Sequence, residues 1–97
     1  MQAVINHLYL NVPIETIRQT AEQSLLPILN EIPGFRKFDL VKAAEDHLIA
    51  LLFWEDLESA NHGASVIGPT WFAQNVAPYL KSEQERSLGE VVLQYRL

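Results

Sequence analysis

The sequence predicts an α+β fold of the ferredoxin-like type, a four-stranded antiparallel sheet with two helices on one face. Four short segments have the apolar, β-branched and aromatic patterns of strands, and in two longer segments apolar residues recur every three or four residues. Along the chain these segments follow the order strand, helix, strand, strand, helix, strand. With 97 residues, 48% of them hydrophobic, the chain has the size of one compact domain, expected over residues 1–97.

The first strand is expected over residues 3–12, which are rich in β-branched and aromatic side chains and contain no Gly or Pro. Alternation gives the strand two faces. One face carries Val4, Asn6, Leu8 and Leu10, and the other carries Ile5, His7 and Tyr9. Neither face is polar enough to be exposed to solvent, so other parts of the protein or a partner are expected to cover both.

Helical spacing follows over residues 14–32. Pro27 lies inside this pattern and cannot donate a backbone hydrogen bond, so a kink or short break is expected there. Pro33-Gly34 ends the helix.

Two strands follow, over residues 35–42 and 47–54. In the first, Phe35 is expected to share a face with Lys37, Asp39 and Val41. The turn between the strands is too short for a helical crossover, which predicts an antiparallel hairpin. The second strand is apolar on both faces, as expected of a central strand covered on both sides.

The second helix is expected from Leu57, with acidic residues just before it that complement the helix dipole. Gly68-Pro69 interrupts its pattern and Pro78 ends it. Residues 81–86 are interpreted as a charged surface loop, and residues 89–97 as the last strand.

The face of the sheet away from the helices would be apolar, since it carries Ile5, His7 and Tyr9 together with one row of residues 47–54. A monomer would expose more apolar surface there than soluble proteins usually tolerate. A second copy packed sheet to sheet would cover it, so a homodimer is expected.

Composition excludes several functions. The net charge of −5 disfavours binding to nucleic acid or to an anionic membrane. The lack of cysteine excludes disulfides and thiolate metal sites, and the three histidines have no metal-ligand spacing, so no metal is expected. The start lacks a basic signal region, and the longest apolar run is far shorter than the roughly 20 residues of a membrane span. A cytoplasmic protein is expected.

Three stretches carry a resemblance: Phe53-Trp54-Glu-Asp-Leu-Glu58, Trp71-Phe-Ala-Gln-Asn-Val-Ala-Pro78 and Gly89-Glu-Val-Val92. In these the chain resembles small proteins of the antibiotic biosynthesis monooxygenase-like group, in the dimeric α/β barrel superfamily. The resemblance implies that two ferredoxin-like chains pair into a barrel. It also implies an oxygenase that acts on polycyclic aromatics or quinols with no cofactor.

Another branch of the same group degrades haem with an Asn on the first strand and a Trp and a His on the second helix. Asn6 matches the first of these positions. The other two fall near Gly63 and Ala73, so the resemblance does not imply haem degradation here.

Asn6 and His62 are the candidate catalytic residues. A cofactor-free oxygenase could use the Asn6 amide to hold a substrate oxygen or to stabilise a developing anion. An alternative is that nearby backbone or water satisfies this amide. His62 would suit a general base at neutral pH, although a lone His without a carboxylate partner is more often a surface residue.

The candidate substrate-binding residues are Trp71, Phe72 and Tyr79, whose flat apolar rings could hold an aromatic ligand. Because Trp71 and Phe72 are adjacent, at most one of them is expected to face the cavity. The alternative is that this aromatic row is plain core.

Two functions remain open. One is a homodimeric, cofactor-independent monooxygenase acting on a small aromatic or quinol-like substrate. The other is a non-catalytic dimeric module of the same fold that binds a small ligand or a protein partner, favoured by the lack of a complete catalytic set.

Overall fold

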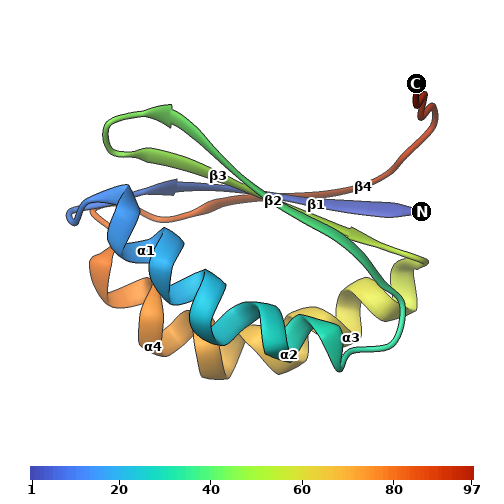
Figure 1. The fold of residues 1–97 in the computed structure, drawn as a ribbon, viewed down its shortest axis with the longest axis horizontal. Coiled ribbons are helices and arrows are strands. Elements are labelled where there is room, and N and C mark those ends of the chain that lie inside the picture. The colour runs from blue at the N-terminus through green and yellow to red at the C-terminus, as the bar shows by residue number, and fades with distance from the viewer.

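The computed structural model describes residues 1–97 and has the predicted βαββαβ order (Figure 1). The four strands are β1 (Gln2–Tyr9), β2 (Phe35–Ala44), β3 (His47–Trp54) and β4 (Glu85–Glu90). They form one antiparallel sheet in the order β2-β3-β1-β4, and the helices cover one of its faces. The predicted ferredoxin-like fold is confirmed.

The first of two helical rods runs through α1 (Ile14–Thr20), a π-helical turn η1 (Ala21–Leu25) and α2 (Leu26–Asn30). Pro27 is the second residue of α2, directly after the π turn. Proline has no N–H to donate, and a wider turn ahead of it accommodates the missing bond. The break expected at Pro27 is therefore a local widening within a continuous helical rod.

The second helical rod, in the same layer, consists of α3 (Leu57–Ile67), the π turn η2 (Gly68–Phe72), α4 (Ala73–Asn75) and the 3₁₀ turn η3 (Ala77–Tyr79). Asp56 caps α3, because its carboxylate accepts a 2.8 Å hydrogen bond from the Ser59 amide. That bond lowers the pKa of Asp56. None of the helices is long and apolar enough to cross a bilayer.

A bulge near the start of β2 corrects the predicted facing of Phe35. The register passes from Phe35 opposite Trp54 directly to Lys37 opposite Phe53, so Arg36 is an extra residue. The extra residue turns Phe35 toward the helices, where its ring meets Trp54 edge-on with centroids 5.6 Å apart.

The last strand begins earlier than predicted. Residues 81–86 were interpreted as a loop and residues 89–97 as a strand, but β4 spans Glu85–Glu90 and residues 91–97 leave the sheet (Figure 1). All six side chains of β4 are exposed, so this edge strand has no apolar alternation to mark it. Its place is fixed by backbone pairing with β1.

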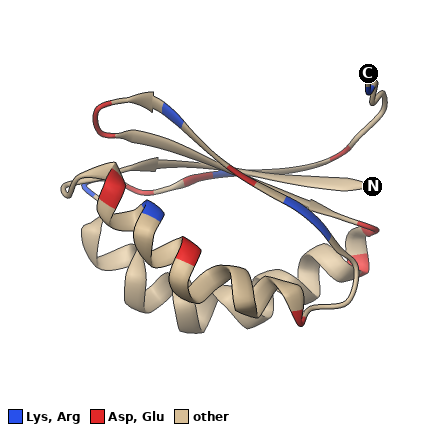
Figure 2. Cartoon of the chain, in the orientation of Figure 1, with Lys and Arg blue, Asp and Glu red and all other residues tan.

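The core lies between the sheet and the helices, and every residue in it is apolar. Trp54, Leu29, Leu48 and Val76 are its largest fully buried side chains. Charged residues of both signs are spread along the strands, the β2–β3 turn and the helices (Figure 2).

The open face of the sheet carries the rows that the sequence predicted for it. Ile49, Leu51 and Phe53 of β3 are half-buried there beside Ile5 of β1. His7 and His47 also meet on this face, with 2.9 Å between Nδ1 and Nε2. The helices leave this face uncovered, with its apolar centre on β1 and β3 and polar residues of β2 and β4 at its edges.

Trp54 and Gly63 set the spacing between β3 and α3. Trp54 is 1% exposed, and a Cβ built on Gly63 would overlap the Cη2 and Cζ2 atoms of its ring. Only glycine lets the helix backbone lie this close to the indole.

We expect Gly63→Ala to lower the free energy of unfolding by about 1–3 kcal/mol, because the buried indole has no room to move aside. Gly68→Ala is the matched control. A Cβ there meets nothing within 4 Å, so we expect it to be neutral or slightly stabilising. Urea denaturation of both variants measures the difference, and equal effects would contradict the close contact.

Candidate functional site

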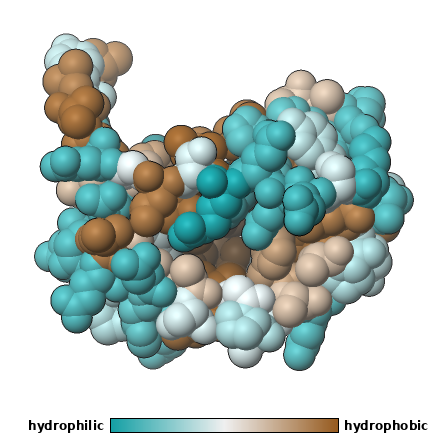
Figure 3. Space-filling model, turned by 180° about the vertical axis from the view of Figure 1, so that it is seen from behind, coloured by the Kyte–Doolittle hydropathy of each residue, from teal (hydrophilic) through white to brown (hydrophobic).

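A cavity of about 130 Å³ lies between the sheet and the helices. Twenty residues line it, 16 of them hydrophobic. From the β4 side the surface is hollowed, with an apolar interior below hydrophilic side chains (Figure 3). This volume is close to that of the engineered cavity, about 150 Å³, that binds benzene, so the space suits an aromatic ring.

One row of residues across the sheet forms the floor of the cavity. Leu40 of β2, Ala50 of β3, Asn6 of β1 and Arg86 of β4 are register partners in that order, and all four line the cavity. Ala50 lies directly opposite Asn6, and its short side chain leaves space above the floor.

The roof is formed by helical residues, several of them small. Ala21, Ala60, Ala64 and Gly68 line the cavity, and small side chains there keep the helices from filling it. Both π turns contribute, since Ala21 belongs to η1 and Gly68 to η2. Single π turns occur often at functional sites.

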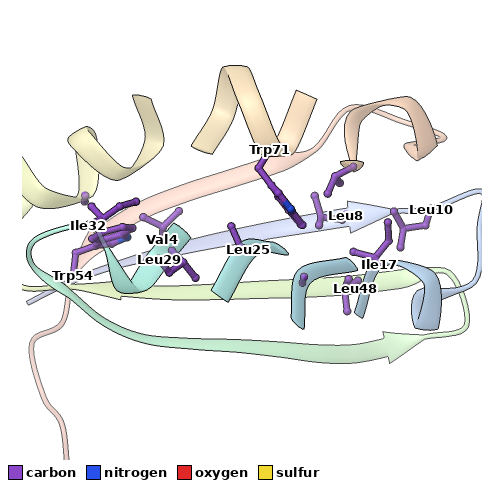
Figure 4. Close-up of a cluster of buried hydrophobic side chains, with 13 residues drawn as sticks. Val4, Leu8, Leu10, Ile17, Leu25, Leu29, Ile32, Leu48, Trp54 and Trp71 are labelled. Carbon is purple, nitrogen blue, oxygen red and sulfur yellow. The ribbon is translucent and has the colours of Figure 1, made fainter. Parts of the chain in front are cut away.

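Trp71 ties the two π turns together. Its Nε1 donates a 2.6 Å hydrogen bond to the hydroxyl of Ser24, so η2 is linked to η1 across the roof. Trp71 is 7% exposed and projects toward Leu8 on β1 (Figure 4). The indole therefore forms a fixed wall of the cavity.

Asn6 supplies the one buried polar group that lacks a partner. Its Oδ1 is shielded from solvent and accepts no hydrogen bond. An unsatisfied buried oxygen is costly, and native proteins rarely retain one without a reason. The sequence left satisfaction by nearby backbone or water as the alternative for this amide. No backbone group bonds its oxygen, and the residue lines the cavity.

Trp71 and Phe72 both line the cavity, which corrects the prediction that at most one of them would. They lie in the π turn η2. A π turn is wider than an α turn, so two consecutive side chains can border the same space.

The structure does not bring His62 or Tyr79 to this cavity. His62 is exposed on the outer surface of α3, in a shallow depression it shares with Pro27 and Glu31. Tyr79 lies in η3, is 38% exposed and is absent from the cavity lining. Asn6, Trp71 and Phe72 are therefore the predicted residues that meet in one place.

Gln84 and Arg86 also line the cavity, and the sequence reasoning missed both because it assigned them to a loop. The pairing of β4 with β1 places Arg86 directly opposite Asn6. Only the register of an edge strand could have revealed this, and a strand with every side chain exposed gives no periodic signal.

No protein-family model matches the chain, and no curated protein matches its sequence. Solved structures match it over nearly its whole length. The crystal structure of SnoaB, a cofactor-independent oxygenase from Streptomyces nogalater, has 13% identity and a TM-score of 0.79, covering 96% of this chain and 94% of that one.

Two further structures show the range of proteins with this fold. A monooxygenase from the gene ActVA-Orf6 of Streptomyces coelicolor, in complex with nanaomycin D, has 14% identity, a TM-score of 0.69 and coverage of 96% and 92%. A protein of unknown function from Nitrosomonas europaea has 15% identity, a TM-score of 0.76 and coverage of 99% and 93%. At these identities the likeness confirms the predicted fold of the antibiotic biosynthesis monooxygenases.

We expect Asn6→Leu to raise the free energy of unfolding by about 1–2 kcal/mol, because it removes an unsatisfied buried oxygen and keeps the side-chain volume. Asn75→Leu is the matched control. The Asn75 amide donates a 3.0 Å bond to the Trp71 carbonyl, so its loss should destabilise the protein. Chemical denaturation measures both, and a destabilised Asn6→Leu would mean that a structural bond holds the Asn6 oxygen.

Proposed function

We propose that this protein is a cofactor-independent monooxygenase, acting on a small aromatic or quinol-like substrate within a homodimeric α/β barrel. The observation that carries the proposal is the unpaired Asn6 oxygen beside an otherwise apolar cavity. The shared fold with oxygenases of this kind supports it.

The cavity chemistry favours a flat substrate with an acidic hydroxyl or C–H group. Trp71, Phe72 and the aliphatic lining offer apolar walls. Less than 1 Å² of Oδ1 is accessible, so the Asn6 side chain would turn toward the substrate. Its Oδ1 would then accept a hydrogen bond from the substrate hydroxyl, and the amide NH₂ would donate to an oxygen that becomes negative during the reaction. No carboxylate or imidazole lines the cavity, so the substrate itself has to lose its proton readily.

With an anthrone-type substrate, the reaction would convert an activated CH₂ group into a ketone. The substrate C–H proton passes to water, and the carbanion transfers electrons to O₂ and forms a C–O bond. The peroxide anion takes a proton back from water. The hydroperoxide then loses water and leaves a ketone, so one oxygen atom enters the product and the other leaves as water. The protein's part is to bind the substrate, orient it and stabilise the anion.

Two surfaces support the homodimer. The centre of the open sheet face, on β1 and β3, is apolar and uncovered, with polar residues of β2 and β4 at its edges, and Val41 on it is 43% exposed. Residues 91–97 extend beyond the sheet with Leu93 86% and Tyr95 82% exposed. A second copy packed on this face, with the tail lying along it, would bury both surfaces.

The alternative is a dimeric binding module of the same fold without catalysis. The absence of an acid–base residue from the cavity lining favours it. Such a protein would bind the same flat ligands and leave them unchanged.

We expect oxygen uptake when the protein is mixed with anthrone or a naphthoquinol, and a fall in kcat of about 10²-fold in Asn6→Ala, the usual loss when one anion-stabilising group is removed. An oxygen electrode measures the rate. Asn61→Ala, on the exposed side of α3, is the control and should keep full activity.

Full turnover in Asn6→Ala would remove Asn6 from the mechanism. Loss of turnover in His62→Ala would show that the His62 imidazole takes part in the mechanism. Tight binding with no oxygen uptake for any substrate would favour the binding module.

We expect the wild-type protein to sediment at micromolar concentration with twice its chain mass of 11.0 kDa. Leu51→Lys puts a charge at the centre of the open face, and Asp39 opposite can pair with it in a monomer, so this variant should fold and sediment as one chain. A wild-type protein that sediments only at 11.0 kDa would rule out the barrel.

A further inference from the structure

Arg86 differs from the other basic residues of the folded part of the chain. Across residues 1–90, all of them except Arg86 have a carboxylate within 4.0 Å. The pairs are Arg18 with Glu15 and Glu22, Arg36 with Glu55, Lys37 with Asp39, Lys42 with Glu45, and Lys81 with Asp46. In a chain with 12 acidic and 7 basic residues, an unpaired guanidinium is unexpected.

The strand register explains why Arg86 stays unpaired. Its neighbour Glu85 lies opposite His7, on the open face of the sheet, whereas Arg86 lies opposite Asn6 on the helix face. No acidic residue lines the cavity that Arg86 borders. The guanidinium therefore lies at the rim of an apolar cavity with its donors free for an external anion.

We propose that the ligand of this cavity carries a carboxylate, which Arg86 binds through its planar fork of N–H donors, and a hydroxyl that donates to Asn6 Oδ1. This rests on the proposed function for the identity of the site, and it adds the substrate class, an aromatic hydroxy acid. Paired guanidinium and carboxylate groups form two parallel charge-assisted hydrogen bonds.

The strand register places the two residues side by side. Asn6 and Arg86 are directly opposite in an antiparallel pair, where Cβ atoms lie about 4.5–5.5 Å apart. The guanidinium extends several bonds beyond its Cβ, so one aromatic ligand can place a hydroxyl near Asn6 and a carboxylate farther out, toward β4. The ring itself would occupy the apolar space below Trp71.

The two groups divide recognition between them. Asn6 Oδ1 is fully shielded and has no partner, so a ligand without a hydrogen-bond donor would leave it unsatisfied. Arg86 is exposed at the rim, so its attraction for an anion is weakened by water and by salt. Anion selectivity should therefore be moderate and salt-dependent.

The experiment compares 6-hydroxy-2-naphthoate, whose hydroxyl is too far from the carboxylate to bond to it, with its methyl ester, which has the same ring and hydroxyl but no charge. Binding is measured by quenching of tryptophan fluorescence and by calorimetry, for the wild type, Arg86→Gln and Arg96→Gln. Arg96 is the matched control, since it lies in the tail outside the cavity lining.

We expect the wild type to bind the acid about tenfold more tightly than the ester, a ratio that corresponds to one moderately exposed charged pair. Arg86→Gln should lose this preference, and Arg96→Gln should keep it. High salt should reduce the preference in the wild type. We expect Arg86→Gln to fold, because Arg86 is exposed on the edge strand.

Equal binding of acid and ester by the wild type overturns the inference, as does a preference that survives Arg86→Gln. Failure of both compounds to bind overturns it as well. The assay needs no turnover, so it separates this inference from the oxygenase. A preference for the acid without oxygen uptake would support the anion site and contradict the proposed monooxygenase. Oxygen uptake without a preference for the acid would support the monooxygenase and contradict the anion site.

Discussion

The contact between Trp54 and Gly63 fixes the distance between the sheet and the helical layer, and the rest of the structure depends on it. The indole is almost fully buried and lies against the one α3 residue that has no side chain. Phe35 braces the same ring from β2, after the bulge turns it inward. With one end of the layer held so closely, small residues farther along can leave a space unfilled.

That space combines features that a plain hydrophobic core would lack. An ordinary core of this size would be filled with large side chains, and a polar side chain in it would find a partner. Here Ala50 lies opposite Asn6, and the Asn6 oxygen has no partner. Trp71 contributes a bond to Ser24 that fixes the wall, so the cavity is maintained by defined contacts.

Most of the fold could be predicted from the sequence because its elements differ in period. The apolar run of β3 and the helical spacing around Ile17 depend on local sequence, and both were recognised. The start of β4 could not be predicted, because its residues are exposed and only pairing with β1 selects them. Since Arg86 is on that strand, the site was predicted only in part, through Asn6, Trp71 and Phe72.

The proline-associated π turns leave the roof of the cavity with fewer backbone hydrogen bonds than its floor. Pro27 and Pro69 each remove one rung from the hydrogen-bond ladder of the roof, whereas the floor is cross-linked by strand pairing on both sides of Asn6. Because the Trp71–Ser24 bond links the two π turns, a larger ligand would have to displace both turns together above a floor that stays in place. The floor would therefore restrict which polar groups a ligand can carry more strictly than the roof restricts the size of the ligand.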